Sequence, residues 1–175
     1  DELNSESEDG TPSFTTDYKE VFFTRCEAGK RETKGCKIMY STRQGDKWND
    51  PKDTGILPDS VVAAHPAISP DGLTLYFVAE ISGGAGGKDI WSVTRTKTSD
   101  PWSKPQNAGL DINTKGDELF PYVRNNGMLY FSSYGLIGMG GLDIFRAVSQ
   151  PDGSWVVTNL KAPINSSADD FGITF

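Results

Sequence analysis

The sequence predicts an all-β protein built from repeated units, and three observations lead to this prediction. The 175 residues include 19 glycines and 10 prolines, which indicates many turns. The apolar residues come in short runs, such as 75–78 and 129–131, bounded by turn residues, as in strands. The same landmarks also return at a fixed spacing, because 54 residues separate Phe23 from Phe77 and Phe77 from Phe131. A fixed period of this length is typical of repeat folds.

Each unit is expected to contain four short strands. The first follows a proline, and the second is the apolar run, which we expect to be buried on both faces. The third carries an Asp-Ile-aromatic sequence, and the fourth begins at Trp48, Trp102 or Trp155. Asp-Gly and Asn-Gly pairs between the first two strands favour tight hairpin turns. Four antiparallel strands per unit, repeated at this period, predict a β-propeller whose blades stack on one another.

Three blades fit the chain, at about residues 12–50, 66–108 and 121–160, followed by the start of a further blade at 169–175. Closed propellers usually have about four to eight blades, so we expect a piece of a larger propeller or closure by oligomerisation. The edges at 3–14 and 171–175 would leave Phe14, Phe171, Ile173 and Phe175 partly uncovered. We therefore expect residues 1–175 alone to be prone to aggregation or to self-associate.

Charge and hydropathy argue against two classes of protein. Lys plus Arg number 17 and Asp plus Glu number 24, so the net charge is −7 and a nucleic-acid binder is disfavoured. No run of about 18 apolar residues exists that could span a membrane. No charged segment followed by an apolar one opens the chain, so we expect any signal peptide to be removed or to lie upstream.

Several stretches resemble known families. Residues 65–77, HPAISPDGLTLYF, resemble the WD-like propeller repeat of TolB-type periplasmic proteins. Residues 86–91, 113–121, 138–145 and 163–172 are similar to the propeller of Bacteroidota outer-membrane-associated proteins that end in an OmpA-like peptidoglycan-binding domain. That family includes a periplasmic component of the type IX secretion system. The resemblance covers nearly the whole chain.

The resemblance implies a non-enzymatic scaffold in the periplasm at the outer membrane. Its partners would be outer-membrane or secretion-system proteins, and peptidoglycan would be bound only through a domain outside these residues. Two alternatives stay open: a propeller that binds glycan or peptidoglycan fragments, and the propeller part of a hydrolase. The chain has no G-x-S-x-G motif, and its one histidine, His65, is expected to pack or form hydrogen bonds at a blade entry. The tryptophans at repeat spacing favour packing over sugar stacking.

Three acidic pairs precede the expected innermost strands: Glu8 and Asp9, Asp117 and Glu118, and Asp169 and Asp170. Carboxylates that converge at one mouth of the channel could bind structural Ca²⁺. Val62 and Ala63 stand in that place in the second unit and interrupt the ring. The alternative, which we favour, is that these residues cap turns in a solvated acidic rim and that no cofactor is required.

Asp89 and Asp143 follow glycine-rich turns at equivalent positions of two units. We expect each carboxylate to accept backbone N–H groups of its turn. The turn at 83–87 does not have the spacing of a calcium-binding nonapeptide roll.

Cys26 and Cys36 flank the turn between the second and third strands of the first unit. In a chain that resembles periplasmic proteins, this placement predicts a disulfide that closes the polar loop 27–35. The alternative is two free thiols in a cytosolic protein. Asp59, Ser60 and Val61 resemble the short O-glycosylation motif of Bacteroidota periplasmic proteins, which predicts modification of Ser60; the alternative is an ordinary exposed loop.

Overall fold

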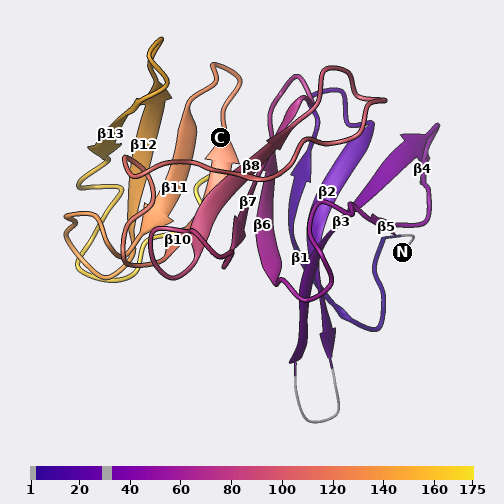
Figure 1. Cartoon of the computed structure of the whole chain (residues 1–175), viewed down its shortest axis with the longest axis horizontal. Coiled ribbons are helices and arrows are strands. Elements are labelled where there is room, and N and C mark those ends of the chain that lie inside the picture. The colour runs from indigo at the N-terminus through magenta and orange to yellow at the C-terminus, as the bar shows by residue number, and fades with distance from the viewer. Residues whose placement is uncertain (1–2, 29–32) are drawn as a thin grey trace.

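The structure is a computed structural model, and it describes residues 3–28 and 33–175. This part of the chain contains strands and turns but no helix, and its strands form three antiparallel sheets that stand side by side (Figure 1). The predicted all-β fold of stacked antiparallel blades is confirmed.

We call the sheets blades 1, 2 and 3 in chain order. Blade 1 contains β1 (Glu8–Phe14), β2 (Glu20–Ala28), β3 (Thr33–Gln44), β4 (Lys47–Trp48) and β5 (Lys52–Asp53). Blade 2 contains β6 (Ala63–Ile68), β7 (Thr74–Ala79), β8 (Asp89–Thr94) and β9 (Gln106–Asn107). Blade 3 contains β10 (Glu118–Val123), β11 (Leu129–Ser133), β12 (Asp143–Ser149) and β13 (Trp155–Asn159). The first strands are neighbours, because β6 lies against both β1 and β10.

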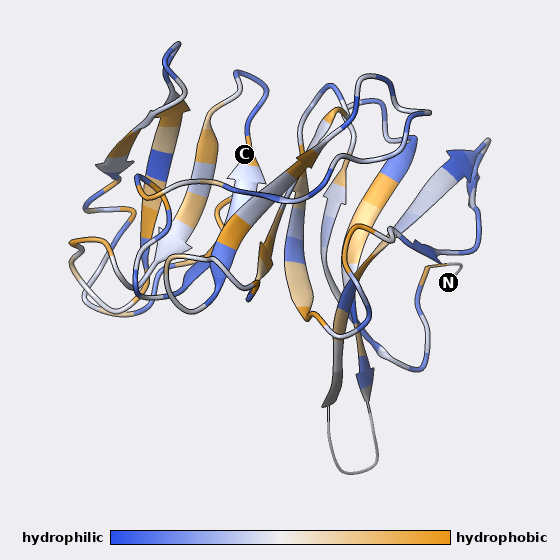
Figure 2. Ribbon diagram, in the orientation of Figure 1, coloured by the Kyte–Doolittle hydropathy of each residue, from blue (hydrophilic) through white to orange (hydrophobic). Residues whose placement is uncertain are grey.

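Two apolar layers hold the blades together. Between blades 1 and 2, Phe22 and Ile38 pack against Phe77 and its neighbours on β7 and β8. Between blades 2 and 3, Ile90 and Phe131 belong to the corresponding layer. Figure 2 shows hydrophobic residues along the strands of all three blades. The middle strands β7 and β11 are buried along most of their length, as their apolar sequences predict.

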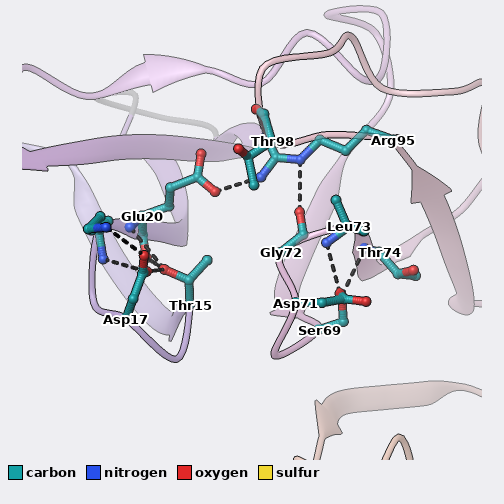
Figure 3. Close-up of polar contacts among 11 residues, drawn as sticks. Thr15, Asp17, Glu20, Ser69, Asp71, Gly72, Leu73, Thr74, Arg95 and Thr98 are labelled. Carbon is teal, nitrogen blue, oxygen red and sulfur yellow. Dashed lines mark hydrogen bonds and ion pairs between the residues drawn. The ribbon is translucent and has the colours of Figure 1, made fainter.

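A largely buried ion pair joins blades 1 and 2 (Figure 3). Arg95 Nη2 lies 2.5 Å from Glu20 Oε2, and the other guanidinium nitrogens donate to Gly72 O and Thr98 O. The two side chains are 6% and 14% exposed. Because every guanidinium nitrogen has an acceptor, the buried charge of Arg95 is compensated.

The hairpin turns of blades 1 and 2 share one hydrogen-bond pattern (Figure 3). Ser69 Oγ donates to Asp71, and Asp71 accepts the Leu73 N–H in turn. Thr15 and Asp17 make the equivalent bonds in blade 1. Gly72, as predicted for an Asp-Gly turn, has a positive φ of 72°.

The first strands begin before the proline, so the prediction that they follow it is wrong. Thr11, His65 and Phe120 each precede a proline and have φ values of 47°, 51° and 51°. The strand register shifts at these residues, as in a β-bulge. Each bulge carries the strand past its proline, which cannot donate to the ladder.

The fourth strand begins at the tryptophan in blade 3 alone, at Trp155. In blade 1 the strand is split into β4 and β5, and Pro51 lies between them. In blade 2 it is reduced to β9, which follows Pro105. Each proline lacks the N–H that a continuous strand needs, and β13 contains no proline.

Residues 160–170 repeat the geometry of the segment that leads into blade 3. Asp170 N donates to Leu142 O, as Glu118 N donates to Lys88 O. Residues 171–175 follow this lead-in and form no strand.

Candidate functional site along the inner strands

A groove of about 760 Å³ runs along the first strands of the three blades. Its lining comes from four segments that are far apart in sequence: 11–18, 65–70, 120–125 and 172–175. We call it the inner groove. It exists because the repeat places β1, β6 and β10 side by side, so that equivalent residues of successive blades share one surface.

A column of stacked rings stands at the bulges beside this groove. The His65 and Phe120 ring centroids are 4.0 Å apart with an interplanar angle of 14°. Phe171 continues the column at 5.0 Å from Phe120. His65 Nδ1 accepts the Phe120 N–H at 3.3 Å, and His65 N–H donates to Thr24 Oγ1 at 3.0 Å. His65 therefore packs and forms hydrogen bonds at a blade entry, as predicted.

The environment of His65 keeps its ring neutral. Burial lowers the pKa of His65 from 6.5 to about 4, and the positive charge of Lys88 acts in the same direction. A neutral ring leaves Nδ1 able to accept the Phe120 N–H.

A second aromatic group lies at the other end of the groove. Phe175 contacts the rings of Tyr122 and Tyr130 at 5.9 Å and 5.0 Å. The guanidinium carbon of Arg124 lies 4.4 Å from the Phe175 ring centroid, a cation–π distance. Across the groove, Tyr18 is 61% exposed, so ring surface is available to a ligand.

The described residues that line the inner groove include neither aspartate nor glutamate, although the chain has 24 of them. Asp17 and Asp71 lie beside it in sequence, but their carboxylates accept hydrogen bonds from their own hairpin turns. Those bonds hold the pKa of both carboxyl groups below its usual range. Arg124 is the one arginine or lysine among the described lining residues.

Prolines interrupt the backbone edge that faces the groove. Pro12, Pro66 and Pro121 occupy equivalent places after the bulges and have no N–H to donate. A partner strand could not form a regular ladder along these residues. The groove is therefore suited to side-chain contacts rather than to strand addition.

The predicted calcium ligands lie in separate hydrogen-bond networks. Asp9 Oδ2 accepts the Ser5 N–H and Asp170 Oδ2 accepts the Ser166 N–H, while Asp9 also pairs with Arg25. Asp117 and Asp169 accept backbone N–H groups of the preceding blade, and Glu8 is exposed. Within residues 3–28 and 33–175, no three His, Cys, Asp or Glu side chains are grouped as metal ligands would be. Calcium binding stays a prediction.

Glu118 is the buried member of this acidic set. Its carboxylate accepts hydrogen bonds from Thr114 N, Thr114 Oγ1 and Ser133 Oγ at 2.7–2.8 Å. Burial raises its pKa, and the negative charge of Asp89 adds to this effect. These hydrogen bonds hold the segment that leads into blade 3, and this is the turn-capping role that we favour for the acidic pairs.

Asp89 and Asp143 accept the N–H groups of their glycine-rich turns, as predicted. Asp89 Oδ2 binds Ala85 N at 2.5 Å, and Asp143 Oδ2 binds Met139 N at 2.8 Å. A side chain at Gly84 or Gly138 would collide with the carboxylate. The glycines therefore allow each turn to close over its aspartate.

The predicted disulfide between Cys26 and Cys36 is confirmed. The two residues face each other across β2 and β3, with their Cα atoms 4.0 Å apart. The long hairpin that carries the disulfide extends beyond the other blades (Figure 1). Ser60 is exposed beside Asp59, whose carboxylate pairs with Lys37 at 2.6 Å. Glycosylation of Ser60 stays a prediction.

The repeated tryptophans pack against other rings and apolar layers. Trp102 lies edge-on to Phe22 at 6.0 Å, and the Arg95 guanidinium covers it at 4.3 Å. Trp155 packs against the layer between blades 2 and 3, and Trp48 contacts the Phe14 ring at 6.0 Å. These contacts are those of packing residues.

The structure reveals a role that we did not derive from the sequence, a pair of asparagine latches between successive segments. Asn113 Oδ1 accepts the Ile90 N–H at 2.8 Å, and Asn113 Nδ2 donates to Ile90 O at 2.9 Å. Asn165 makes the same two bonds to Ile144. Both asparagines are at most 2% exposed. In the sequence, an asparagine stands four residues before each of these acidic pairs, and this recurrence was the signal that could have revealed the role.

Neither a protein-family model nor a curated protein matches the chain. Solved structures do match it. TolB from Acinetobacter baumannii has a TM-score of 0.56 and 19% identity, over 92% of this chain and 34% of that one. A puromycin-hydrolysing peptidase from Mycobacterium tuberculosis has a TM-score of 0.58 and 14% identity, over 97% and 25%. An endo-arabinase from Bacteroides thetaiotaomicron has a TM-score of 0.51 and 16% identity, over 82% and 59%.

These identities support the fold and nothing more specific. The chain spans between a quarter and three fifths of the matched proteins, whose names include both TolB and hydrolases. In the part of the chain that the structure describes, no helix has the length and apolar character needed to cross a membrane. The fold of the chain is thus a TolB-like β-propeller fold in three blades.

Proposed function

We propose that the chain is a non-enzymatic propeller scaffold that binds another protein in the periplasm at the outer membrane. The observation that carries the proposal is the inner groove, which offers exposed rings and hydroxyl groups over about 760 Å³. Such a surface suits a polypeptide partner, because aromatic rings contribute large contact areas at protein interfaces.

The chemistry of the groove favours binding over hydrolysis. Glycoside hydrolysis canonically needs two Asp or Glu side chains beside the scissile bond, and the described lining contains neither residue type. His65 already uses Nδ1 to accept the Phe120 N–H, so this nitrogen is not free to accept a proton from a nucleophile. The activities named for the peptidase and the endo-arabinase are therefore not extended to this chain.

The proposed compartment rests on the disulfide and on the family resemblance. Disulfides persist in oxidising compartments such as the periplasm, and Cys26 and Cys36 are bonded. The motifs at 86–91, 113–121, 138–145 and 163–172 resemble the propeller of PorE and related OmpA-family proteins. We therefore propose a role in the type IX secretion machinery or in a related peptidoglycan-associated envelope complex.

Site-specific photocrosslinking in cells that produce the protein would test this function. A photoreactive residue at Asn125, an exposed position in the groove, should crosslink to an outer-membrane or secretion-system protein. The same residue at Val156, which is 54% exposed and outside the groove, serves as the control. Adducts that are absent, or equal at both positions, would contradict the proposal.

A further inference from the structure

We propose that the inner groove binds an extended, acidic polypeptide segment, with Arg124 as the residue that receives a carboxylate. This inference rests on the proposed function and specifies the chemistry of the partner. It concerns the end of the groove where Arg124 lies over Phe175.

Arg124 differs from the arginines that form ion pairs in the described chain. Arg25, Arg43 and Arg95 each pair with a carboxylate of the protein. Arg124 has no such partner within residues 3–28 and 33–175, and its side chain lies against the Phe175 ring instead. The ring holds a planar, charged donor group at the groove without neutralising it. An unpaired guanidinium can bind a carboxylate through two parallel hydrogen bonds.

Charge complementarity selects an acidic partner. The chain carries a net charge of −7, so most of its surface repels an acidic segment. Among the described residues that line the groove there is no aspartate or glutamate side chain, and Arg124 is the one arginine or lysine. An acidic segment that approaches the protein therefore meets the least repulsion at the place where Arg124, the one unpaired cation of the described lining, is available.

The backbone of the groove selects an extended segment that does not join a sheet. Pro12, Pro66 and Pro121 cannot donate hydrogen bonds to an added strand. Exposed rings instead offer the kind of surface that receives polyproline II segments, which need no backbone ladder. Tyr18 and Phe175, both 61% exposed, provide the rings.

Isothermal titration calorimetry with acetylated repeat peptides would test the proposal. A Glu-Pro repeat should bind more tightly than the matched Gln-Pro repeat. The Arg124→Gln variant should weaken Glu-Pro binding by about tenfold and remove the preference, because it deletes one charge-assisted contact. Arg124→Lys should retain part of the preference, and added salt should reduce it.

Lys104→Gln is the charge-matched control, since Lys104 is exposed and outside the groove. It should bind as the unchanged protein does. Equal affinity for both peptides, no binding of either, or no effect of Arg124→Gln would overturn the proposal. Tighter binding of an acidic oligogalacturonate than of the Glu-Pro peptide would overturn the assignment to polypeptide. The crosslink at Asn125 reports on the proposed function separately, because it requires a protein partner of either charge.

Discussion

At the level of single residues, the blades are joined by side chains that bind backbone atoms of a neighbouring blade. Asn113 satisfies both the N–H and the C=O of Ile90, and His65 accepts the N–H of Phe120. Each bond occupies a backbone group that would otherwise be buried without a partner. Removing such a side chain costs more free energy than the intact bond contributes to stability. The backbone group left behind stays buried, so water does not replace the lost partner.

Replacement of Asn113 by alanine should lower the free energy of unfolding by about 2–4 kcal/mol, because it leaves two buried backbone groups of Ile90 unpaired. Urea denaturation followed by tryptophan fluorescence would measure the change. Asn125→Ala, at an exposed position, should change stability by no more than about 0.5 kcal/mol. Equal effects of the two substitutions would contradict the latch.

The pKa of His65 predicts acid sensitivity. It is lowered from 6.5 to about 4 on folding, so between these pH values the unfolded chain binds a proton that the folded chain does not. The contribution of His65 to the free energy of unfolding is fully present above pH 6.5 and is lost as the pH falls to about 4. The loss is at most about 3 kcal/mol, and less where water reaches the ring.

Parallel urea titrations of the protein and of His65→Gln would isolate this contribution from that of the carboxylates. The difference in unfolding free energy between the two should shrink as the pH falls from 7 to 4. A difference that stays constant over this range would show that His65 does not titrate as described.

The positive φ values at Thr11, His65 and Phe120 could not be predicted from the sequence. A residue before proline normally takes an extended conformation, so each local sequence favours the opposite geometry. Two of the bulges are fixed from outside the strand, by Thr24 Oγ1 and by the His65 ring of the preceding blade. Such bonds depend on residues about 40 to 55 positions away in the chain.

At the level of elements, the sequence predicted the second and third strands well and the outer strands poorly. The apolar runs and the Asp-Ile-aromatic motifs correctly predict β7, β8, β11 and β12. These strands are mostly buried, and buried positions require apolar residues that are easy to recognise in the sequence. The fourth strand lies at the edge of its sheet, where partial exposure leaves a weak apolar signal. Proline chemistry at Pro51 and Pro105 explains its interruption once the pairing is known.

The hairpin of β2 and β3 depends on its disulfide. A Cys26→Ser/Cys36→Ser variant should lose about 2–3 kcal/mol of stability, because the unfolded chain is no longer restricted by a short closed loop. Hydrogen exchange should accelerate chiefly at the hairpin end of these strands, since the apolar layers lie elsewhere. Unchanged exchange there would contradict this account.

Mass spectrometry of protein taken from its native compartment provides a second test of the same bond. The mass without reductant should be lower by the two hydrogen atoms that are lost on oxidation. Two thiols that alkylate freely would contradict both the bond in the cell and the proposed compartment.

At the level of the whole molecule, the period of 54 residues was enough to predict the stack of blades. It was not enough to predict the inner groove, because its lining comes from four segments that meet only after the blades have packed. The acidic composition of the chain did not reveal the groove either, because the described lining contains no aspartate or glutamate. The acidic pairs attracted attention in the sequence because they recur, yet their hydrogen bonds belong to the connections between blades.

Residues 1–175 in isolation should self-associate. Phe171 and Phe175 are 55% and 61% exposed, and burying such ring surface in a contact between copies is favourable by about 25 cal/mol per Å². Sedimentation velocity should show an average mass that increases with concentration. A Phe171→Ser/Phe175→Ser variant should reduce the association, whereas Ile137→Ser, at a 95% exposed position outside the groove, should not. A monomer at all concentrations would contradict this prediction.

The asparagine latches give the molecule a direction of assembly. Asn113 follows blade 2 in the chain and binds Ile90 of that blade, and Asn165 follows blade 3 and binds Ile144. Each connection is thus fixed by a strand that precedes it, and no latch needs chain that comes later. A polypeptide that emerges with its N-terminus first can add one blade at a time to a finished surface. The latches therefore allow the blades to mature in the order in which they are delivered, whether by the ribosome or by a translocation channel.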